Sequence, residues 1–337
     1  MVALITSPLM FKTVACTFRS GAMGQLTVFN LDTLEPAGTI PSVKSGGAIV
    51  DPKSHHGFST TKPLTMWDSQ TLQVVKMIDV DGRPDGIMLD AFNSRVWVFS
   101  HQPPYATVID AKEGSVVGTI DLDGQPEQAA TDGKGTVYVN ITDKANIAVV
   151  DAKNLTVTKH LDLSSKGVDN GSGLSLDVKN HILFSYWRLP TPEVVIVNAE
   201  NGAILDTLPT DVNVDTVGFN PATMEAISTA GAGSIVFVKE NSPTSFAVEH
   251  RLKTIPGARN MVANEAAKIA QFVPKALDTP RHGVRNVKKL WLEGFGGLPS
   301  KIGRHRPEGW LHFHQTFERV TPDGSAPFPA SWTAIAG

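Results

Sequence analysis

The stretch that decides the fold is "DGRPDGIMLD" at residues 81–90, which returns in altered form as "DGQPEQAATD" at 123–132. Both contain Asp-Gly, a variable residue, Pro and an acid, and five residues after the acid an Asp ends a short apolar run. A pattern that returns at a nearly fixed spacing is typical of repeat proteins. Its spacing along the whole chain therefore indicates the architecture.

The residue that ends the apolar run recurs at intervals of 39 to 45 residues, as Asp51, Asp90, Asp132, Asp177, Asn220 and Asn264. A turn and a second apolar stretch follow it, such as "RVWVFSH" or "GTVYVNI", and then a hairpin such as "ATVIDAKEGSVVGTI". The turns are rich in Asp, Asn, Lys and Gly, as tight turns require. Each unit is expected to contain four short strands, and no helical period precedes residue 260.

Four-stranded units of this size, repeated around an axis, form a β-propeller, which protects its sheet edges by radial repetition. The pairs of first and second strands number seven, from 3–18 to 260–273, whereas the hairpins number six and end at 235–252. The sequence therefore predicts an all-β, seven-bladed propeller with six complete blades and a partial seventh. The first strand of each blade would line the central channel. The Pro-acid corner, where the chain arrives from the preceding blade, would then lie at the mouth of that channel.

The hairpins "ATVIDAKEGSVVGTIDLDGQPE" and "IAVVDAKNLTVTKHLDL" resemble those of the YncE-like, YVTN-repeat propellers, and "VYVN" at 137–140 is similar to their YVTN tetrad. The resemblance covers about 13–262 and implies a seven-bladed, WD40-like ring. It also implies a periplasmic or extracellular location, and most family members have no established reaction. The same scaffold resembles seven-bladed lactonases and the propeller subunits of redox enzymes.

The chain departs from this family at both ends. It starts inside the first strand of blade one, without the signal peptide that family members usually carry. After residue 262 the repeat stops, and 263–270 are expected to be helical rather than extended. We therefore divide the chain into a propeller, 1–262, and a divergent segment, 263–337, partly helical or disordered. That segment is either an evolved closing module or the product of a shifted reading frame.

The composition is that of an ordinary globular protein, with 41% hydrophobic and 19% charged residues and a net charge of −3. Such a balance gives no general attraction to nucleic acid, and no apolar stretch is long enough to span a membrane. The single cysteine, Cys16, excludes an internal disulfide. A monomer without specific nucleic-acid binding is expected.

Candidate ligand-binding residues at the channel mouth are those five positions before each strand-ending residue, namely Asp85, Glu127, Ser172, Asp215 and Arg259. Converging carboxylates raise one another's pKa or attract a cation. The alternative is that each acid merely caps its own turn. The loops on the same face add His101 and the "SYWRLP" stretch, with Tyr186, Trp187 and Arg188. An aromatic pair beside an Arg would suit a sugar or another ring, unless both aromatic residues pack beneath a neighbouring blade.

Two functions are compatible with these residues. The first is a propeller that binds a small molecule or a protein partner on its top face, with no cofactor and no identified catalytic residue. The second is a lactonase-like hydrolase, in which the channel carboxylates hold a divalent cation or activate water. The tail stretch "HRPEGWLHFHQTFE" (305–318) matches no known metal-ligand spacing, so no metal site is assigned to it.

Overall fold

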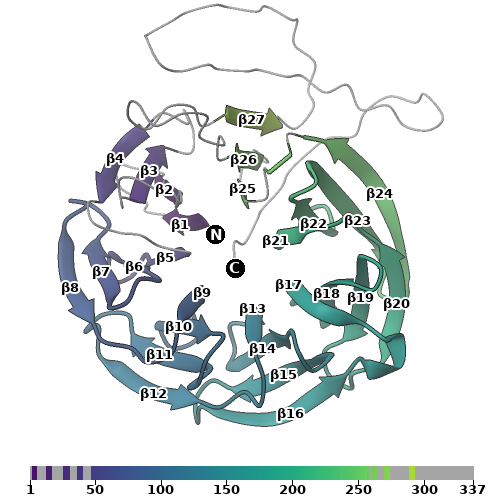
Figure 1. Cartoon of the computed structure of the whole chain (residues 1–337), viewed down its shortest axis with the longest axis horizontal. Coiled ribbons are helices and arrows are strands. Elements are labelled where there is room, and N and C mark those ends of the chain that lie inside the picture. The colour runs from purple at the N-terminus through teal and green to yellow at the C-terminus, as the bar shows by residue number, and fades with distance from the viewer. Residues whose placement is uncertain are drawn as a thin grey trace, which may run out of the picture.

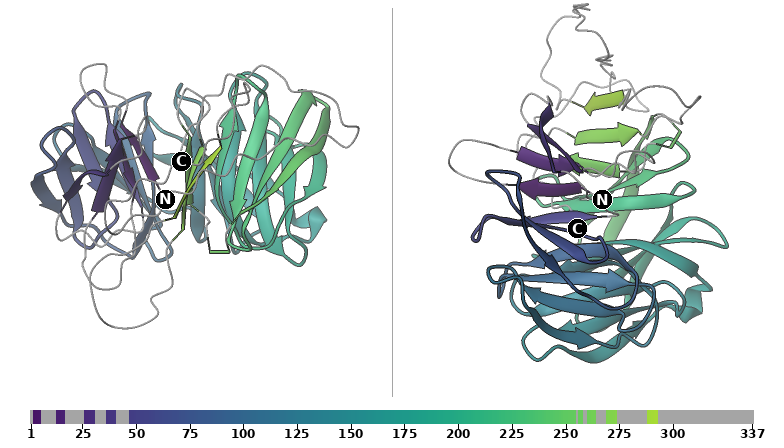
Figure 2. Two further views of the ribbon diagram at one scale, coloured as in Figure 1. Left: turned by 90° about the horizontal axis from the view of Figure 1, so that it is seen from above. Right: turned by 60° about the vertical axis from the view of Figure 1, so that its left-hand side comes forward.

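The computed structural model describes 2–5, 13–16, 26–30, 36–40, 47–254, 256–257, 260–263, 269–273 and 288–292. Within these ranges the chain forms strands, turns and one short 3-10 helix, η1 (Ser164–Lys166), and no α-helix. The strands form seven antiparallel sheets around a central channel (Figure 1). Seen edge-on, the ring is a disc that is wider than it is thick (Figure 2).

Six sheets have four strands and the seventh has three. The first three sheets consist of β1 (Val2–Ile5), β2 (Thr13–Cys16), β3 (Leu26–Asn30) and β4 (Pro36–Ile40); β5 (Ala48–Asp51), β6 (His56–Ser59), β7 (Leu64–Asp68) and β8 (Val74–Ile78); and β9 (Pro84–Asp90), β10 (Arg95–Ser100), β11 (Ala106–Asp110) and β12 (Val116–Ile120). The next three consist of β13 (Pro126–Thr131), β14 (Thr136–Ile141), β15 (Asn146–Asp151) and β16 (Thr156–Asp162); β17 (Asp169–Asp177), β18 (Ile182–Leu189), β19 (Glu193–Asn198) and β20 (Ile204–Pro209); and β21 (Val214–Asn220), β22 (Glu225–Ala230), β23 (Ser234–Ser242) and β24 (Ser245–Lys253). The last contains β25 (Asn260–Ala263), β26 (Ile269–Val273) and β27 (Lys288–Leu292).

The ring closes through its innermost strands. The first strand of each sheet contacts the first strand of the next, and β1 also contacts β25 of the seventh sheet. This arrangement confirms the predicted propeller of six complete blades and a partial seventh.

The helix expected over 263–270 is wrong at both of its ends, because Ala263 ends β25 and Ile269 begins β26. These two residues pair with each other across the sheet, and ladder hydrogen bonds outweigh a weak helix propensity. The pairing of β26 and β27 continues the sheet beyond residue 262, where the sequence predicts the propeller to end. The boundary itself stays a prediction, since most of 264–337 lies outside the described residues.

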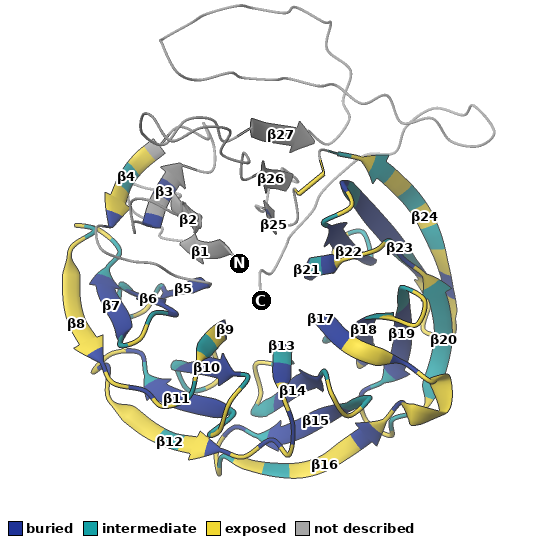
Figure 3. Cartoon of the chain, in the orientation of Figure 1, coloured by how far each residue is buried: buried dark blue, intermediate teal, exposed yellow. Residues whose placement is uncertain are grey.

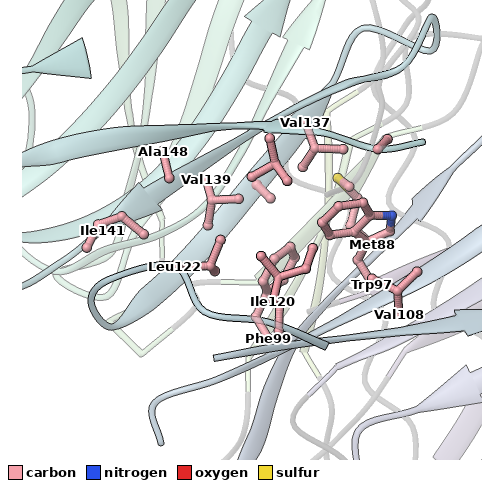
Figure 4. Packing of buried hydrophobic residues seen from close by; sticks show 14 residues of the cluster. Met88, Trp97, Phe99, Val108, Ile120, Leu122, Val137, Val139, Ile141 and Ala148 are labelled. Carbon is pink, nitrogen blue, oxygen red and sulfur yellow. The ribbon is translucent and has the colours of Figure 1, made fainter. Parts of the chain in front are cut away.

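The blades bury both faces of their middle strands against their neighbours. Trp97 and Phe99 of β10 pack with Val137 and Val139 of β14 in one cluster between two blades (Figure 4). The outermost strands β8, β12 and β16 are exposed along most of their length (Figure 3). Burial on both faces explains why the middle strands are continuous apolar runs rather than alternating ones.

The residue that ends each innermost strand closes the turn that follows it. The Oδ1 atoms of Asp51, Asp90, Asp132, Asp177 and Asn220 accept hydrogen bonds from the backbone N–H groups of Lys53, Phe92, Lys134, Lys179 and Ala222, at 3.2, 3.2, 2.7, 2.9 and 3.0 Å. Asp and Asn form this short-range bond more readily than other residues. The strand-ending acids are therefore structural, and Asn264 lies outside the described residues.

Two buried carboxyl groups have pKa values raised toward neutrality. Burial, together with the carboxylate of Asp177 in the neighbouring blade, raises the pKa of Glu240 to about 7. Asn180 Nδ2 donates to Glu240 Oε1 at 2.6 Å and lowers the pKa of Glu240, but burial outweighs this bond. Burial also raises the pKa of Glu225, and the nearby carboxylate of Glu249 adds to this rise. Both groups favour a protonated state in the folded protein.

We predict that Glu240→Gln raises the thermal midpoint by several degrees at about pH 8 and changes it little at about pH 5. The folded pKa of Glu240 lies above its ordinary value of 4.5, so its contribution to stability is complete below that value and is lost as the pH rises through 7. Gln keeps an acceptor for Asn180 and carries no charge that burial or Asp177 would destabilise. Calorimetry at both pH values measures the effect, with the exposed Glu113→Gln as the control. Equal shifts at the two pH values would contradict the prediction.

Candidate functional site

Four innermost strands carry a β-bulge near their beginning, in four consecutive blades. At each bulge two residues oppose one residue of the second strand. The bulged pairs are Asp85–Gly86, Glu127–Gln128, Ser172–Gly173 and Asp215–Thr216. A bulge bends its strand and turns a side chain away from the regular alternation. The repeated corner in the sequence therefore produces a repeated bulge at one end of the channel.

Packing between neighbouring bulges is tight. A Cβ atom on Gly86 would lie 2.8 Å from the carbonyl oxygen of Glu127 in the next blade, so only glycine fits there. Gln128 Nε2 donates to the carbonyl oxygen of Asp215 at 2.7 Å and links β13 to β21. These contacts hold the first residues of the bulges at fixed positions relative to one another.

His101, directly after β10, joins the acids of two blades. Its Nε2 atom lies 3.0 Å from Glu127 Oε2 and 3.7 Å from Asp85 Oδ2. The hydrogen bond with Glu127 raises the pKa of His101, and the charges of both carboxylates act in the same direction against partial burial. The two carboxylates therefore stabilise the charged form of the imidazole relative to its neutral form.

Arg188, near the end of β18, lies beside the same carboxylate. Its Nη2 atom is 3.5 Å from Glu127 Oε1 and 3.8 Å from Asp215 Oδ1. Its Nε donates to the carbonyl oxygen of Val214 at 3.0 Å, and its Nη1 donates to Asn170 Oδ1 at 3.3 Å. The guanidinium is thus fixed by several partners and holds one oxygen of Glu127 while His101 holds the other.

We call Asp85, His101, Glu127, Arg188 and Asp215 the mouth cluster. Their side chains are between 21% and 49% exposed, so a solute can reach them. All five were predicted as candidate ligand-binding residues, and the structure brings them together at one end of the channel. Whether they bind a ligand stays a prediction.

Two other predicted channel residues differ in placement. Ser172 is fully buried, and its hydroxyl donates to the carbonyl oxygen of Val214 at 2.7 Å, so that hydroxyl supports the sheet packing. Arg259 lies outside the described residues. The channel end that the structure describes is therefore acidic with two cationic groups, and it lacks the predicted free hydroxyl.

The predicted stacking platform of Tyr186 and Trp187 is wrong. Both side chains are fully buried within β18, where alternate residues face the blades on either side. Tyr186 packs with residues of the next blade, whereas Trp187 packs toward the preceding one and donates from Nε1 to Ser185 Oγ at 2.8 Å. The alternative interpretation, packing beneath a neighbouring blade, holds for both.

Sequence reasoning missed Asn170 and Gln128. Asn170 anchors Arg188, and Gln128 reaches across the channel end to β21. Gln128 stands beside Glu127 in the repeated motif, so its position in the corner was a usable signal. No spacing in the sequence indicates Asn170, because its contact forms across a strand pair.

Comparison with known proteins identifies the fold. No protein-family model matches the chain. The uncharacterized protein YncE of Escherichia coli O157:H7 is 30% identical over 130 residues, which cover 35% of this chain and 36% of YncE. The chain is a β-propeller, and this part of it is similar to YncE. It matches only about a third of the length of that curated relative.

Solved structures agree with the propeller fold. A chain of the hydrazine synthase of Kuenenia stuttgartiensis aligns with a TM-score of 0.64 and 14% identity, over 77% of this chain and 88% of that one. A functionally unknown protein from Desulfotomaculum acetoxidans aligns with a TM-score of 0.64 and 12% identity, over 77% and 92%. A chain of a mitotic checkpoint complex aligns with a TM-score of 0.66 and 9% identity, over 80% and 84%. At these identities the likeness concerns the fold alone.

Within the described residues, no helix meets the length and apolarity needed to span a bilayer.

We predict that Glu127→Gln lowers the pKa of His101 toward its ordinary value of 6.5. The substitution removes both the charged hydrogen-bond partner and half of the adjacent negative charge. NMR titration of the His101 ring protons, in the presence of a chelator, measures the midpoint. Asp81→Asn removes an exposed acid from the loop before β9, the strand that carries Asp85, and is expected to leave the midpoint unchanged. An unchanged midpoint in Glu127→Gln would contradict the pairing.

Proposed function

We propose that the protein is a binding propeller that takes a small, hydroxyl-rich ligand, such as a sugar or sugar acid, at the mouth cluster. The observation that carries this proposal is the convergence of five charged, solvent-accessible side chains from four consecutive blades on one end of the channel. Ligand sites on propellers need residues that are adjacent in space but distant in sequence, and these residues span 85 to 215.

The chemistry of the cluster favours hydroxyl groups as partners. A hydroxyl both donates and accepts hydrogen bonds, and the cluster offers carboxylate acceptors next to imidazole and guanidinium donors. Three carboxylates face two cationic groups, so the cluster has an excess of negative charge even when His101 is protonated. This excess disfavours nucleic acid and other polyanions.

The test is a thermal-shift and calorimetric screen with sugars, sugar acids and sugar lactones on the full chain. A ligand that binds the folded ring raises its unfolding temperature by mass action. We predict that Glu127→Gln and Asp215→Asn each weaken binding about tenfold or more, because each removes a charged hydrogen-bond acceptor. Asp81→Asn, with the same charge change on an exposed loop position, serves as the matched control.

Two outcomes would count against this proposal. Binding that survives both cluster substitutions would place the ligand elsewhere on the ring. If no compound in the screen binds, the small-ligand proposal fails, and a protein partner on this face becomes the better hypothesis.

A lactonase-like hydrolase is the second candidate, and the pairing of His101 with Glu127 favours it. In its neutral form, an imidazole oriented by a carboxylate can accept a proton from water, and such general-base catalysis contributes typically 10²–10⁴-fold. Steady-state hydrolysis of the lactones in the screen tests this candidate. His101→Asn is expected to reduce kcat by about 10²-fold or more. No turnover by the unmodified protein would reject it.

A further inference from the structure

Three members of the mouth cluster form a set of metal ligands. Asp85, His101 and Glu127 each offer one ligand atom, and these atoms all lie within 4.8 Å of one another. We propose that they bind one divalent transition-metal ion, with Zn²⁺ and Mn²⁺ as the leading candidates, and that the proposed ligand binds to this ion. This inference rests on the proposed function in taking the mouth cluster as the binding site.

The distances suit a metal without rearrangement of the backbone. Bonds from a metal ion to imidazole nitrogen and carboxylate oxygen are about 2.0–2.2 Å long, so ligand atoms in a tetrahedral site lie about 3.3–3.6 Å apart. His101 Nε2 lies 3.0 Å and 3.7 Å from its two carboxylate neighbours, on either side of that range. The Asp85 side chain is about half exposed, so its rotation can adjust the third position.

The types of ligand select the class of metal. Ca²⁺ and Mg²⁺ prefer sites made entirely of oxygen atoms, whereas imidazole suits Zn²⁺ and other transition metals. Three protein ligands also leave coordination positions for water or for hydroxyl and carboxylate oxygens of a ligand. The exposed side of the cluster makes these positions accessible.

The surrounding charges balance a divalent ion. The carboxylates of Asp85 and Glu127 neutralise two positive charges, and Asp215 lies beside Arg188 and offsets its charge. Arg188 also holds Glu127 Oε1, which leaves Oε2 directed at His101. Partners that orient a ligating carboxylate in this way are typical of built metal sites.

The scaffold fixes the backbone positions of the three ligands relative to one another. Asp85 and Glu127 occupy bulges of adjacent innermost strands, and the close approach of Gly86 to the Glu127 backbone fixes their separation. His101 follows β10, the strand paired with β9, so all three ligands come from two neighbouring blades. The site therefore needs no segment outside the described residues.

The experiment is a titration of the tag-free full chain with Co²⁺, Zn²⁺ and Mn²⁺ after treatment with a chelator. We expect one equivalent of metal to bind, with visible absorption bands for Co²⁺ and competition by Zn²⁺. Asp85→Asn, Glu127→Gln and His101→Asn should each weaken binding about tenfold or more, since each removes a ligand atom or its charge. Asp81→Asn should bind like the unmodified protein.

A second control addresses the histidines of the C-terminal segment. A double variant, His312→Asn with His314→Asn, removes two closely spaced histidines that could take up metal. This variant is expected to retain the stoichiometric site. Metal binding lost in this variant but kept in Asp85→Asn and His101→Asn would overturn the proposal. So would the absence of stoichiometric binding.

The screen for sugars separates this inference from the proposed function. If the metal binds at the cluster but no small ligand does, the proposed function fails and the metal site stands. If a ligand binds through Glu127 and Asp215 with the same affinity in chelator as in Zn²⁺, the proposed function stands and the metal inference is overturned.

Discussion

The structure depends on one constraint: the middle strands of each sheet are apolar on both faces, and in this chain both faces are buried against neighbouring sheets. The clusters around Trp97, Trp187 and Phe184 each lie between adjacent blades. Closing the row of sheets into a ring gives every blade two neighbours, and the contact of β1 with β25 completes it. The apolar middle strands, the exposed outer strands and the central channel all follow from this arrangement.

The ring also explains why acidic residues of one repeat motif have two different roles. In five blades the Asp or Asn at the end of the innermost strand accepts a hydrogen bond from the backbone N–H two residues later and so closes its own turn. The residue five positions earlier lies in a bulge nearer the other end of the strand, and in three blades it is an acid of the mouth cluster. These acids from different blades come together around His101 and Arg188.

The mouth cluster illustrates how a symmetric scaffold acquires an asymmetric site. The bulge is repeated in four blades, but the residue in it changes from Asp to Glu to Ser and back to Asp. His101 and Arg188 then reach in from the ends of two different second strands and divide the oxygens of Glu127 between them. Glu127 is therefore the carboxylate that both cationic side chains contact.

The sequence by itself determined the fold and the axial position of the acids. The interval of about 43 residues, with turn residues between apolar runs, indicates four-stranded blades, and a constant offset of five residues locates Asp85, Glu127 and Asp215. These features are local, since a turn or a bulge depends on residues a few positions apart. Only the tertiary structure decided that Tyr186 and Trp187 are buried, that the Ser172 hydroxyl bonds to Val214, and that His101 pairs with Glu127. Each of these contacts joins one blade to the next. Such contacts depend on how the faces of adjacent blades pack, and the spacing of residues within a single repeat does not encode that packing.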